Sequence, residues 1–479
     1  MAVAAAPAPP EGGYGWVIVG CYVANMACAI QLVQMMGLVL KDVFRTNDIT
    51  DSQGTTILTL CGGVSFMLGV VAGPLIRRYG FRRVAAAGAL LGAAGLALCS
   101  TARTFAEFIL YFSLLMGIKG SRSKIKKGFV LKMSSGLSMS YPAYIVALNS
   151  YFRVRRTLAT AVAMAATGSA AILTPQLISA AASQFGPSGA MLALAGVLLQ
   201  TMIGAALLRP LPSAAPPPPR ALQEAETPML QTVGDHGDEK PQKLAENPQP
   251  TQPAGALRTV ATFFDLELLR TPSFACLLVG TSLGLFADVN FVQFLPFVLS
   301  RRGFSTRDAA DLMSVFGVTD TACRLSAPLL HRTCARSSRF MYAASLGVFV
   351  VARTALLLCD SYTAVMATMA LVGATRGVNV VFLQLLIPDN VPIHRLASAQ
   401  GLYLLFNGVI FMAVGPFMGW MVGKNKDYNV VIVVLAAMNA LTLGVWGAER
   451  LVRTFATWRR GPGPSKSKHP PGKAADAAV

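Results

Sequence analysis

The chain has 479 residues, of which 54% are hydrophobic and only 13% are charged, and its mean hydropathy is +0.54. Soluble domains carry about 25% charged residues, so this composition excludes an ordinary soluble protein and indicates a membrane protein. The net charge of +19 does not predict nucleic-acid binding, because Lys and Arg lie mostly in short loops between apolar segments. At about 20 residues for each span, these segments leave room for about a dozen transmembrane helices.

Cysteine and histidine give no sign of a metal centre or a disulfide framework. The eight cysteines are scattered, without a CxxC pair, and the four histidines lie in polar segments or loops. Such cysteines are typical of small buried apolar residues. There is also no nucleophile–base pair and no phosphate-binding loop. The sequence therefore predicts neither an enzyme, nor a metal site, nor a resident cofactor, and no cleavable signal peptide is expected.

The first half of the chain is predicted to hold six spans. An N-terminal segment, 1–15, precedes a six-helix half at 16–208, with spans at 16–40, 56–76, 84–100, 104–149, 157–179 and 190–208. A basic stretch without acidic residues, 119–133, interrupts the fourth span, and its deletion leaves one continuous hydrophobic segment. We expect 119–133 to be an insertion such as a retained intron, with a genuine basic loop as the alternative. Sequencing the transcript distinguishes the two.

A proline-rich linker separates this half from a second one. Residues 209–271 combine proline runs and mixed charges with few large apolar residues, which is typical of a disordered segment. The second six-helix half is expected at 272–452, with spans at 273–299, 308–330, 340–358, 364–387, 396–422 and 430–452, before a basic tail at 453–479. The predicted fold is therefore an all-α membrane protein with twelve transmembrane helices in two six-helix halves.

Basic residues in the short loops predict the orientation. With the N-terminus inside, the inside loops and the tail carry clearly more Lys and Arg than the outside loops. Both termini and the linker are therefore expected in the cytoplasm. The inside-loop arginines are expected to set topology and contact anionic membrane lipids, with gating through acidic partners such as Asp389 as the alternative. They are Arg77, Arg78, Arg82, Arg83, Arg155 and Arg156.

Asp320 and Arg324 are the most informative pair in the sequence. Both lie near the middle of the span at 308–330, and their four-residue spacing puts them on one face of a helix. An unpaired charge at the bilayer centre is costly, so such residues face a partner, a water-filled cavity or a substrate. Two interpretations stay open. The pair is either an ion pair that only helps helices pack, or a guanidinium for an anionic substrate beside a carboxylate that can take up a proton.

Further polar residues lie inside the second-half spans. Asp288 is central in the seventh span, and Arg376 is central in the tenth, with Asn379 three residues further on the same face. Arg376 is predicted either to bind substrate or to neutralise Asp288 or Asp320. Arg353 is expected to snorkel or to pair locally. Asn407 is expected to bond between helices, with a role in lining the substrate path as the alternative.

Several motifs together resemble the monocarboxylate transporter family, solute carrier family 16, of the major facilitator superfamily. EGGYGW at 11–16 is similar to the signature that opens the family, and YFRVRRTLA at 151–159 resembles its second signature. GPLIRRYGFRR at 73–83 and GPFMGW at 415–420 also resemble the family. Asp320 and Arg324 match the Asp-x-x-x-Arg pair of its eighth span. The resemblance leaves out the linker, the tail and 119–133.

This resemblance implies a plasma-membrane carrier that works by alternating access. Its substrates would be small monocarboxylates or related organic anions and zwitterions, with the proton as the coupling ion in some members and a single-span immunoglobulin-like chaperone as the partner of some. Proton-coupled members have a lysine where this chain has Gln34, so their protonation scheme does not transfer intact. The alternative function is a non-transporting membrane sensor or scaffold of the same fold.

Overall fold

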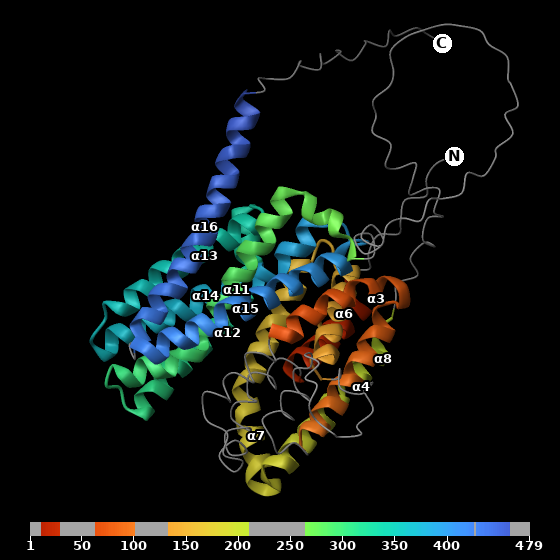
Figure 1. Cartoon of the computed structure of the whole chain (residues 1–479), viewed down its shortest axis with the longest axis horizontal. Coiled ribbons are helices and arrows are strands. Elements are labelled where there is room, and N and C mark those ends of the chain that lie inside the picture. The colour runs from red at the N-terminus through yellow and green to blue at the C-terminus, as the bar shows by residue number, and fades with distance from the viewer. Residues whose placement is uncertain (1–10, 29–62, 101–132, 210–263, 426–427, 460–479) are drawn as a thin grey trace, which may run out of the picture.

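The computed structural model describes residues 11–28, 63–100, 133–209, 264–425 and 428–459, and the secondary structure in these ranges is helical (Figure 1). Gln34 and most of the basic stretch at 119–133 lie outside the described residues. So do the greater part of the linker and the end of the tail. Predictions for those segments stay predictions.

The first half contains short and long helices, and two of the breaks between them fall at glycines. Gly80 has φ +81° between α3 and α4, and Gly186 has φ +70° inside α7, a backbone conformation that favours glycine. Gly186, whose φ and ψ are not helical, separates two helices within α7, and it lies between the spans predicted at 157–179 and 190–208. The helices are Tyr14–Cys28, η1 (Gly69–Val71), α3 (Ala72–Tyr79), α4 (Phe81–Cys99), α6 (Met133–Tyr151), α7 (Arg156–Leu199) and α8 (Thr201–Leu207).

The second half is a series of long helices close to the predicted spans. The largest difference is at the end of α16, which continues to Arg459 and extends away from the bundle at the top of Figure 1. The elements are η2 (Leu266–Arg270), α11 (Pro272–Arg301), α12 (Thr306–Cys334), α13 (Ser338–Leu357), α14 (Tyr362–Asn390), α15 (Leu396–Asn425) and α16 (Tyr428–Arg459).

Serine caps fix where three of these helices begin. Ser305 and Asp308 form a capping box at the start of α12, in which each side chain accepts a hydrogen bond from the main-chain N–H of the other residue. Ser337 caps α13 and Ser361 caps α14. These caps satisfy N–H groups that have no partner within the helix, so each chain segment enters its helix at a defined residue.

Seven helices in the described ranges are long and apolar enough to cross a membrane. They are 81–98, 188–207, 272–299, 338–357, 362–390, 396–418 and 429–455. α12 is not among them because of its charged residues, yet it packs along α14 over much of its length. Asp320 and Arg324 of α12 are buried while Val318, Leu325 and Leu329 are exposed, so these two charges face other helices rather than lipid.

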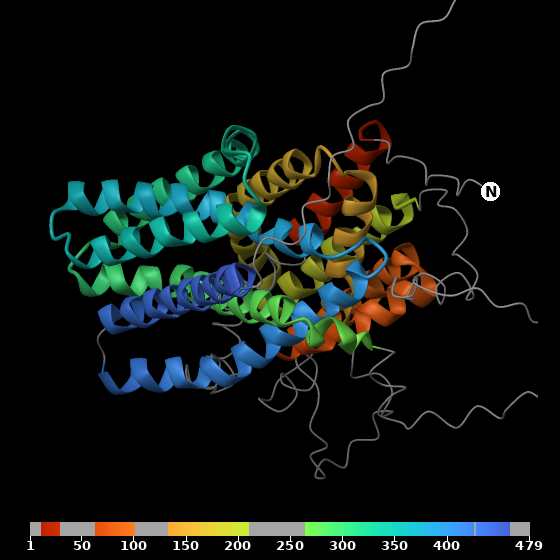
Figure 2. The same cartoon turned by 90° about the horizontal axis from the view of Figure 1, so that it is seen from above.

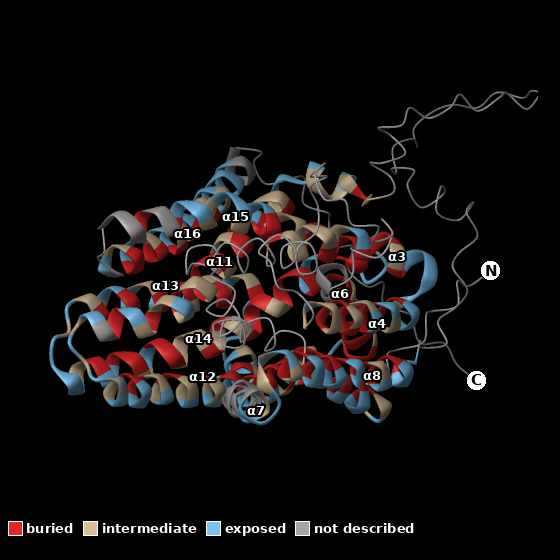
Figure 3. Ribbon diagram, turned by 60° about the horizontal axis from the view of Figure 1, so that its bottom comes forward, coloured by how far each residue is buried: buried red, intermediate tan, exposed pale blue. Residues whose placement is uncertain are grey.

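The two halves form two groups of helices that lie side by side (Figure 2). In the second group α11 packs on α16, and α14 packs on α12 and α13; in the first, α4 packs on α6. The halves meet where α7 contacts α12 and α14, and where α15 contacts η1, α3 and α6. Buried residues follow the faces that helices turn toward one another (Figure 3). The polar residues of α12 and α14 therefore lie close to the junction of the halves.

Candidate functional site

Five charged side chains from four helices of the second half form one group, which we call the central charged cluster. Asp288 is on α11, Asp320 and Arg324 on α12, Arg353 on α13 and Arg376 on α14. All but Arg376 are at most 7% exposed, and the Arg376 side chain is 16% exposed. Charged side chains that are buried this deeply in a helix bundle have charged partners or a function.

Arg376 joins the two carboxylates of the cluster. Its Nε donates to Asp288 Oδ1 at 2.9 Å and its Nη2 to Asp288 Oδ2 at 3.0 Å, while its Nη1 donates to Asp320 Oδ2 at 3.0 Å. The fork-shaped guanidinium suits such two-point contact with a carboxylate. Arg376 therefore pairs with both aspartates at once, where the sequence left its partner open.

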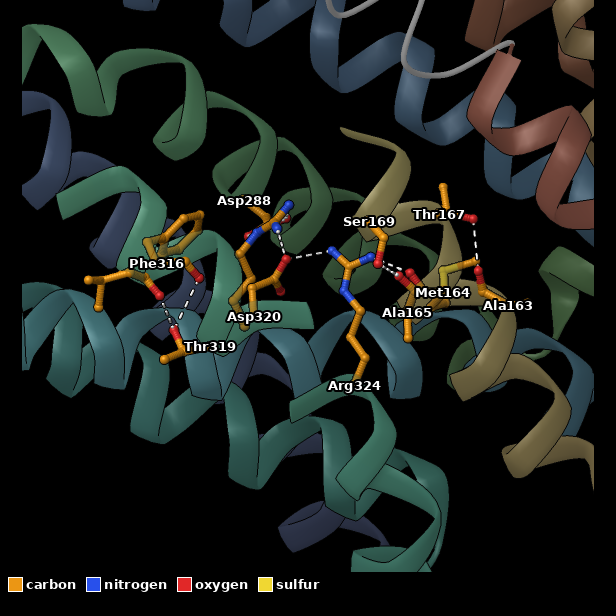
Figure 4. Close-up of polar contacts among 12 residues, drawn as sticks. Ala163, Met164, Ala165, Thr167, Ser169, Asp288, Phe316, Thr319, Asp320 and Arg324 are labelled. Atoms are coloured by element: carbon orange, nitrogen blue, oxygen red, sulfur yellow. Dashed lines mark hydrogen bonds and ion pairs between the residues drawn. The ribbon is translucent and has the colours of Figure 1, made fainter. Parts of the chain in front are cut away.

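Arg324 connects the central charged cluster to the first half. Its Nη2 donates to Asp320 Oδ2 at 2.6 Å, and its Nη1 donates to the main-chain oxygen of Met164 on α7 at 2.5 Å. Figure 4 shows Arg324 reaching from α12 toward the helix that carries Met164, with Asp320 and Asp288 on the other side of its guanidinium. Gly168 on α7 makes room for this approach, because a Cβ there would lie 2.7 Å from Arg324 Nη1. The i,i+4 pair therefore lies at the junction of the halves.

Arg353 is the most deeply buried member of the cluster. It is fully buried, so of the two expectations for it snorkelling is wrong, whereas pairing agrees with its contact to Asp288. Its guanidinium carbon lies 3.8 Å from the ring centre of Phe349 and 4.2 Å from that of Phe291, and its Nη2 lies 3.6 Å from Asp288 Oδ1. None of its three nitrogens makes a hydrogen bond to a described residue. Two aromatic faces and one carboxylate hold the charge.

The remaining predicted binding residues lie apart from these contacts. Asn379 is 5% exposed and accepts a hydrogen bond from Ser345 at 3.4 Å, and Asn407 is fully buried in α15. Neither touches the central charged cluster through a hydrogen bond in the structure. Gln34 lies outside the described residues. The sequence signal that could have found Arg353 is the same one that found Arg376, a lone arginine inside an apolar span.

Arginines and aspartates also join the halves at one end of the bundle, which we call the Arg156 end. Arg156 Nη1 donates to Asp389 Oδ1 at 2.9 Å and to the main-chain oxygen of Pro388 at 3.0 Å, and Asp389 also accepts from Ser338. Arg77 lies 3.5 Å from Asp265. These pairs link α7 to α14 and α3 to the segment before η2. The other arginines expected there, Arg78, Arg82, Arg83 and Arg155, have exposed side chains.

A clasp around Glu11 fixes the N-terminal segment to the start of α7. The Glu11 carboxylate accepts hydrogen bonds from the main-chain N–H groups of Arg153, Val154 and Arg155 at 2.6–2.9 Å. Partial burial acts to raise the pKa of Glu11, but these three donors outweigh it and hold the pKa below its ordinary value. Two of the motifs that resemble family signatures therefore meet in space.

No group of three His, Cys, Asp or Glu side chains able to hold a metal ion occurs among the described residues. The six cysteines whose side chains are described are all free thiols. The chemistry available at the junction of the halves is therefore ionic, through guanidinium and carboxylate groups. Such an arrangement can bind and release an anion.

Comparisons with known proteins agree with this description. A family model described as Major Facilitator Superfamily matches residues 129–336. Monocarboxylate transporter 2 of Meriones unguiculatus is 25% identical over 453 residues, covering 92% of this chain and 84% of that protein. Monocarboxylate transporter 1 of Bos taurus is 26% identical over 432 residues, covering 88% and 81%. The solved structure of the proton:xylose symporter XylE superposes with a TM-score of 0.59 at 13% identity, covering 90% of this chain and 94% of XylE.

The superposition on XylE supports the fold, and the relatives in sequence are carriers rather than enzymes. The charged residues at the junction of the halves, the long apolar helices and the similarity over most of the length agree with one another. The chain is therefore a multi-pass membrane transporter with the major facilitator superfamily fold, and it resembles the monocarboxylate transporters.

Proposed function

We propose that the chain carries small monocarboxylates or related organic anions across the plasma membrane by alternating access. The observation that carries this proposal is the central charged cluster, in which three arginines face only two aspartates. Guanidinium groups are suited to carboxylates, and Arg324 lies where the halves meet, so that an anion bound to it would lie close to both halves. The curated relatives are named for monocarboxylates, which supports the same substrate class.

Arg324 and Arg376 are the groups proposed to take the substrate carboxylate. Arg324 Nε is buried without a hydrogen-bond partner among the described residues, as is Asp320 Oδ1. Arg376 is the most exposed member of the cluster. A substrate carboxylate would therefore first accept a hydrogen bond from Arg324 Nε. It would then replace an aspartate oxygen on the guanidinium of Arg324 or Arg376.

The coupling ion is proposed from the same contacts. A proton taken by Asp320 would make net uptake rise at acidic external pH, as in proton-coupled members of the family. An Asp320 that stays ionised would make uptake indifferent to pH. Oδ2 of Asp320 already accepts hydrogen bonds from two guanidinium groups, from Arg324 at 2.6 Å and from Arg376 at 3.0 Å. We propose facilitative transport rather than proton symport, and the pH dependence of uptake is its test.

Basic residues in the short loops support an orientation with both termini in the cytoplasm, which would make the Arg156 end the cytoplasmic one. Ion pairs between the halves at that end then belong to a conformation that is closed to the cytoplasm. The immunoglobulin-like chaperone expected for some relatives, and the contacts of exposed arginines with anionic lipids, stay predictions.

Uptake of labelled pyruvate, lactate, creatine, carnitine and aromatic amino acids into cells expressing the chain tests the proposal, at external pH of about 6 and about 7.5. We expect uptake of pyruvate or lactate at both pH values. Arg324→Gln should lower it more than tenfold, since removing one partner of a buried charge pair costs about 2–5 kcal/mol. Arg332→Gln removes a guanidinium from the exposed surface of the same helix and is the matched control.

Uptake of an amino acid or quaternary amine in place of monocarboxylates would change the substrate class. Uptake that rises at the lower pH and disappears in Asp320→Asn would reinstate proton symport. No flux of any compound, with the protein confirmed at the cell surface, would contradict transport and favour a sensor or scaffold.

A further inference from the structure

We infer that the last turns of α16, residues 450–459, bind anionic phospholipid at the Arg156 end of the bundle. We call these residues the α16 extension. The inference goes beyond the proposed function, because it does not depend on which substrate the chain carries. It rests on where α16 leaves the bundle, on its length, and on exposed apolar and basic side chains that lie on opposite faces of its end.

Contacts with α13 fix where α16 leaves the bundle. Arg339, at the start of α13, donates hydrogen bonds to the Glu449 carboxylate. The neighbouring Ser338 donates to Asp389, which is the partner of Arg156. Glu449 therefore lies at the Arg156 end, and beyond it α16 continues away from the bundle as the α16 extension (Figure 1).

The α16 helix is longer than a membrane is thick. Its 32 residues, Tyr428–Arg459, make a helix about 48 Å long at about 1.5 Å for each residue. The hydrocarbon core of a bilayer is about 30 Å thick, and the bilayer with its headgroups is about 40–45 Å thick. A helix that crosses the bilayer from Tyr428 therefore reaches the headgroup layer before its end, and the α16 extension lies at that level.

Apolar and basic side chains of the α16 extension lie on opposite faces. Leu451 and Phe455 are four residues apart and share one face of the helix, and they are 61% and 64% exposed. Arg450 and Arg453 are three residues apart and share the opposite face. Arg450 is exposed, and the Arg453 side chain is 59% exposed although it pairs with Glu449. Apolar side chains at this level enter the acyl region, while arginines reach out to the phosphate groups.

The charge of this part of the chain fits an anionic membrane surface. From 450 to 475 the sequence contains seven Lys and Arg and no Asp or Glu. A cluster of about four to eight basic residues beside the cytoplasmic end of a transmembrane helix is typical of segments that bind anionic lipid. With the orientation proposed above, the Arg156 end faces the leaflet that carries such lipid. A phospholipid accounts for both faces of the helix, since acyl chains cover the apolar one, whereas an acidic protein would account only for the basic one.

Hydrogen exchange on the full chain in nanodiscs, one chain in each disc, tests the inference. The discs hold phosphatidylcholine alone or phosphatidylcholine with about 30% phosphatidylserine, which makes the surface strongly anionic. Main-chain amides of 451–459 should exchange about tenfold more slowly in the anionic discs, since each arginine near such a surface strengthens binding about fivefold. Salt raised from about 0.1 M to about 1 M should remove most of this difference, because the Debye length falls from about 10 Å to about 3 Å. Equal exchange in the two kinds of disc, whether fast or slow, would overturn the inference.

Variants separate the charge of the α16 extension from its folding. Arg450→Gln combined with Arg453→Gln should lose most of the slowing, whereas Arg450→Lys combined with Arg453→Lys should keep it. Arg301→Gln removes an exposed arginine at the far end of α11 and should behave as the wild type. A Gln double variant that keeps the full slowing would overturn the role given to the two arginines. Because the discs are symmetric and hold no substrate, these results are independent of transport and of orientation.

Discussion

At the scale of single residues, Asp288 is the carboxylate that pairs with both Arg353 and Arg376. Its carboxylate pairs with Arg376 and is the only acidic group among the described residues within 4 Å of an Arg353 nitrogen. Asp288→Asn would leave Arg353 buried without an anion. Breaking a buried pair by removing one partner costs about 3–5 kcal/mol, and we expect that loss as a lower midpoint of thermal unfolding in detergent.

Two companion variants make this expectation specific. Asp311→Asn removes a carboxylate from the exposed surface of α12 and should leave the unfolding midpoint unchanged. Asp288→Asn combined with Arg353→Gln should recover part of the loss, because the unpaired charge is then gone. If Asp288→Asn alone unfolds at the wild-type temperature, the pairing described here does not stabilise the fold.

Residue identity predicted part of this cluster and missed the rest for a physical reason. Asp320, Arg324, Asp288 and Arg376 could be singled out because a charge inside an apolar span needs a partner. Arg353 obeys the same rule, but its place toward one end of the span allowed snorkelling as an explanation. The structure keeps it inside, between the rings of Phe291 and Phe349. Sequence reports how deep a residue lies along a helix axis, not which way it faces.

At the scale of helices, Gly377 sets how closely α14 approaches α12. A Cβ at Gly377 would overlap the main-chain oxygen of Asp320 and lie 3.1 Å from the main-chain nitrogen of Arg324. Gly377→Ala should therefore separate the two helices and lower stability by about 1–3 kcal/mol, together with pyruvate uptake. Gly444→Ala on α16 meets open space and should be neutral or slightly stabilising. Equal behaviour of the two variants in uptake and thermal unfolding would contradict the packing argument.

The Glu11 clasp makes a helix start depend on pH. The carboxylate accepts from three N–H groups at the start of α7, and its pKa is lowered in the folded state. A lowered folded-state pKa means that the stabilisation is complete above the unfolded-state pKa and disappears as the pH falls through the folded-state value. Glu11→Gln should cost about 1 kcal/mol near neutral pH, given that the site is partly exposed.

Thermal unfolding of the wild type and Glu11→Gln at several pH values measures this dependence. The difference between their midpoints should be largest near pH 7 and should shrink below the ordinary carboxyl pKa of 4.5. A difference that stays constant down to strongly acidic pH would show that the charge of Glu11 contributes nothing.

At the scale of the whole molecule, the pair of Arg156 and Asp389 joins the halves at the Arg156 end. Asp389→Asn should favour conformations in which this end is open. The pair is partly exposed, so the free energy between the closed and open conformations should change by about 1 kcal/mol or less, which is up to about fivefold in population.

Double electron–electron resonance measures this shift as a change in the distance between spin labels at residues 83 and 336, one on each half. Arg453→Gln breaks a pair with Glu449 inside α16 and should leave those distances unchanged. An Asp389→Asn protein with the wild-type distances would show that the pair of Arg156 and Asp389 does not hold this end closed.

How much of the molecule the sequence predicts differs between fold and site. Long apolar segments and their loops predicted the second-half helices within a few residues at most ends, because span length is set by the membrane. Gly186, which separates two helices, lies in the loop predicted between 179 and 190, but the sequence did not predict that helical structure runs almost up to it on both sides. Likewise, the contact of Arg324 with a main-chain oxygen of α7 left no trace in the sequence, because every residue has that oxygen.

That last contact has a consequence for how the protein tolerates variation. Arg324 binds the backbone of Met164, so the side chain at 164 can change while the acceptor stays in place. Gly168, one helical turn away, has no such freedom because any Cβ would meet Arg324. In a saturation library selected for growth on pyruvate, codon 164 should therefore accept many apolar residues and codon 168 almost none. The selected sequences would then vary at position 164, whose backbone accepts the hydrogen bond, and stay glycine at position 168, which only leaves space for Arg324.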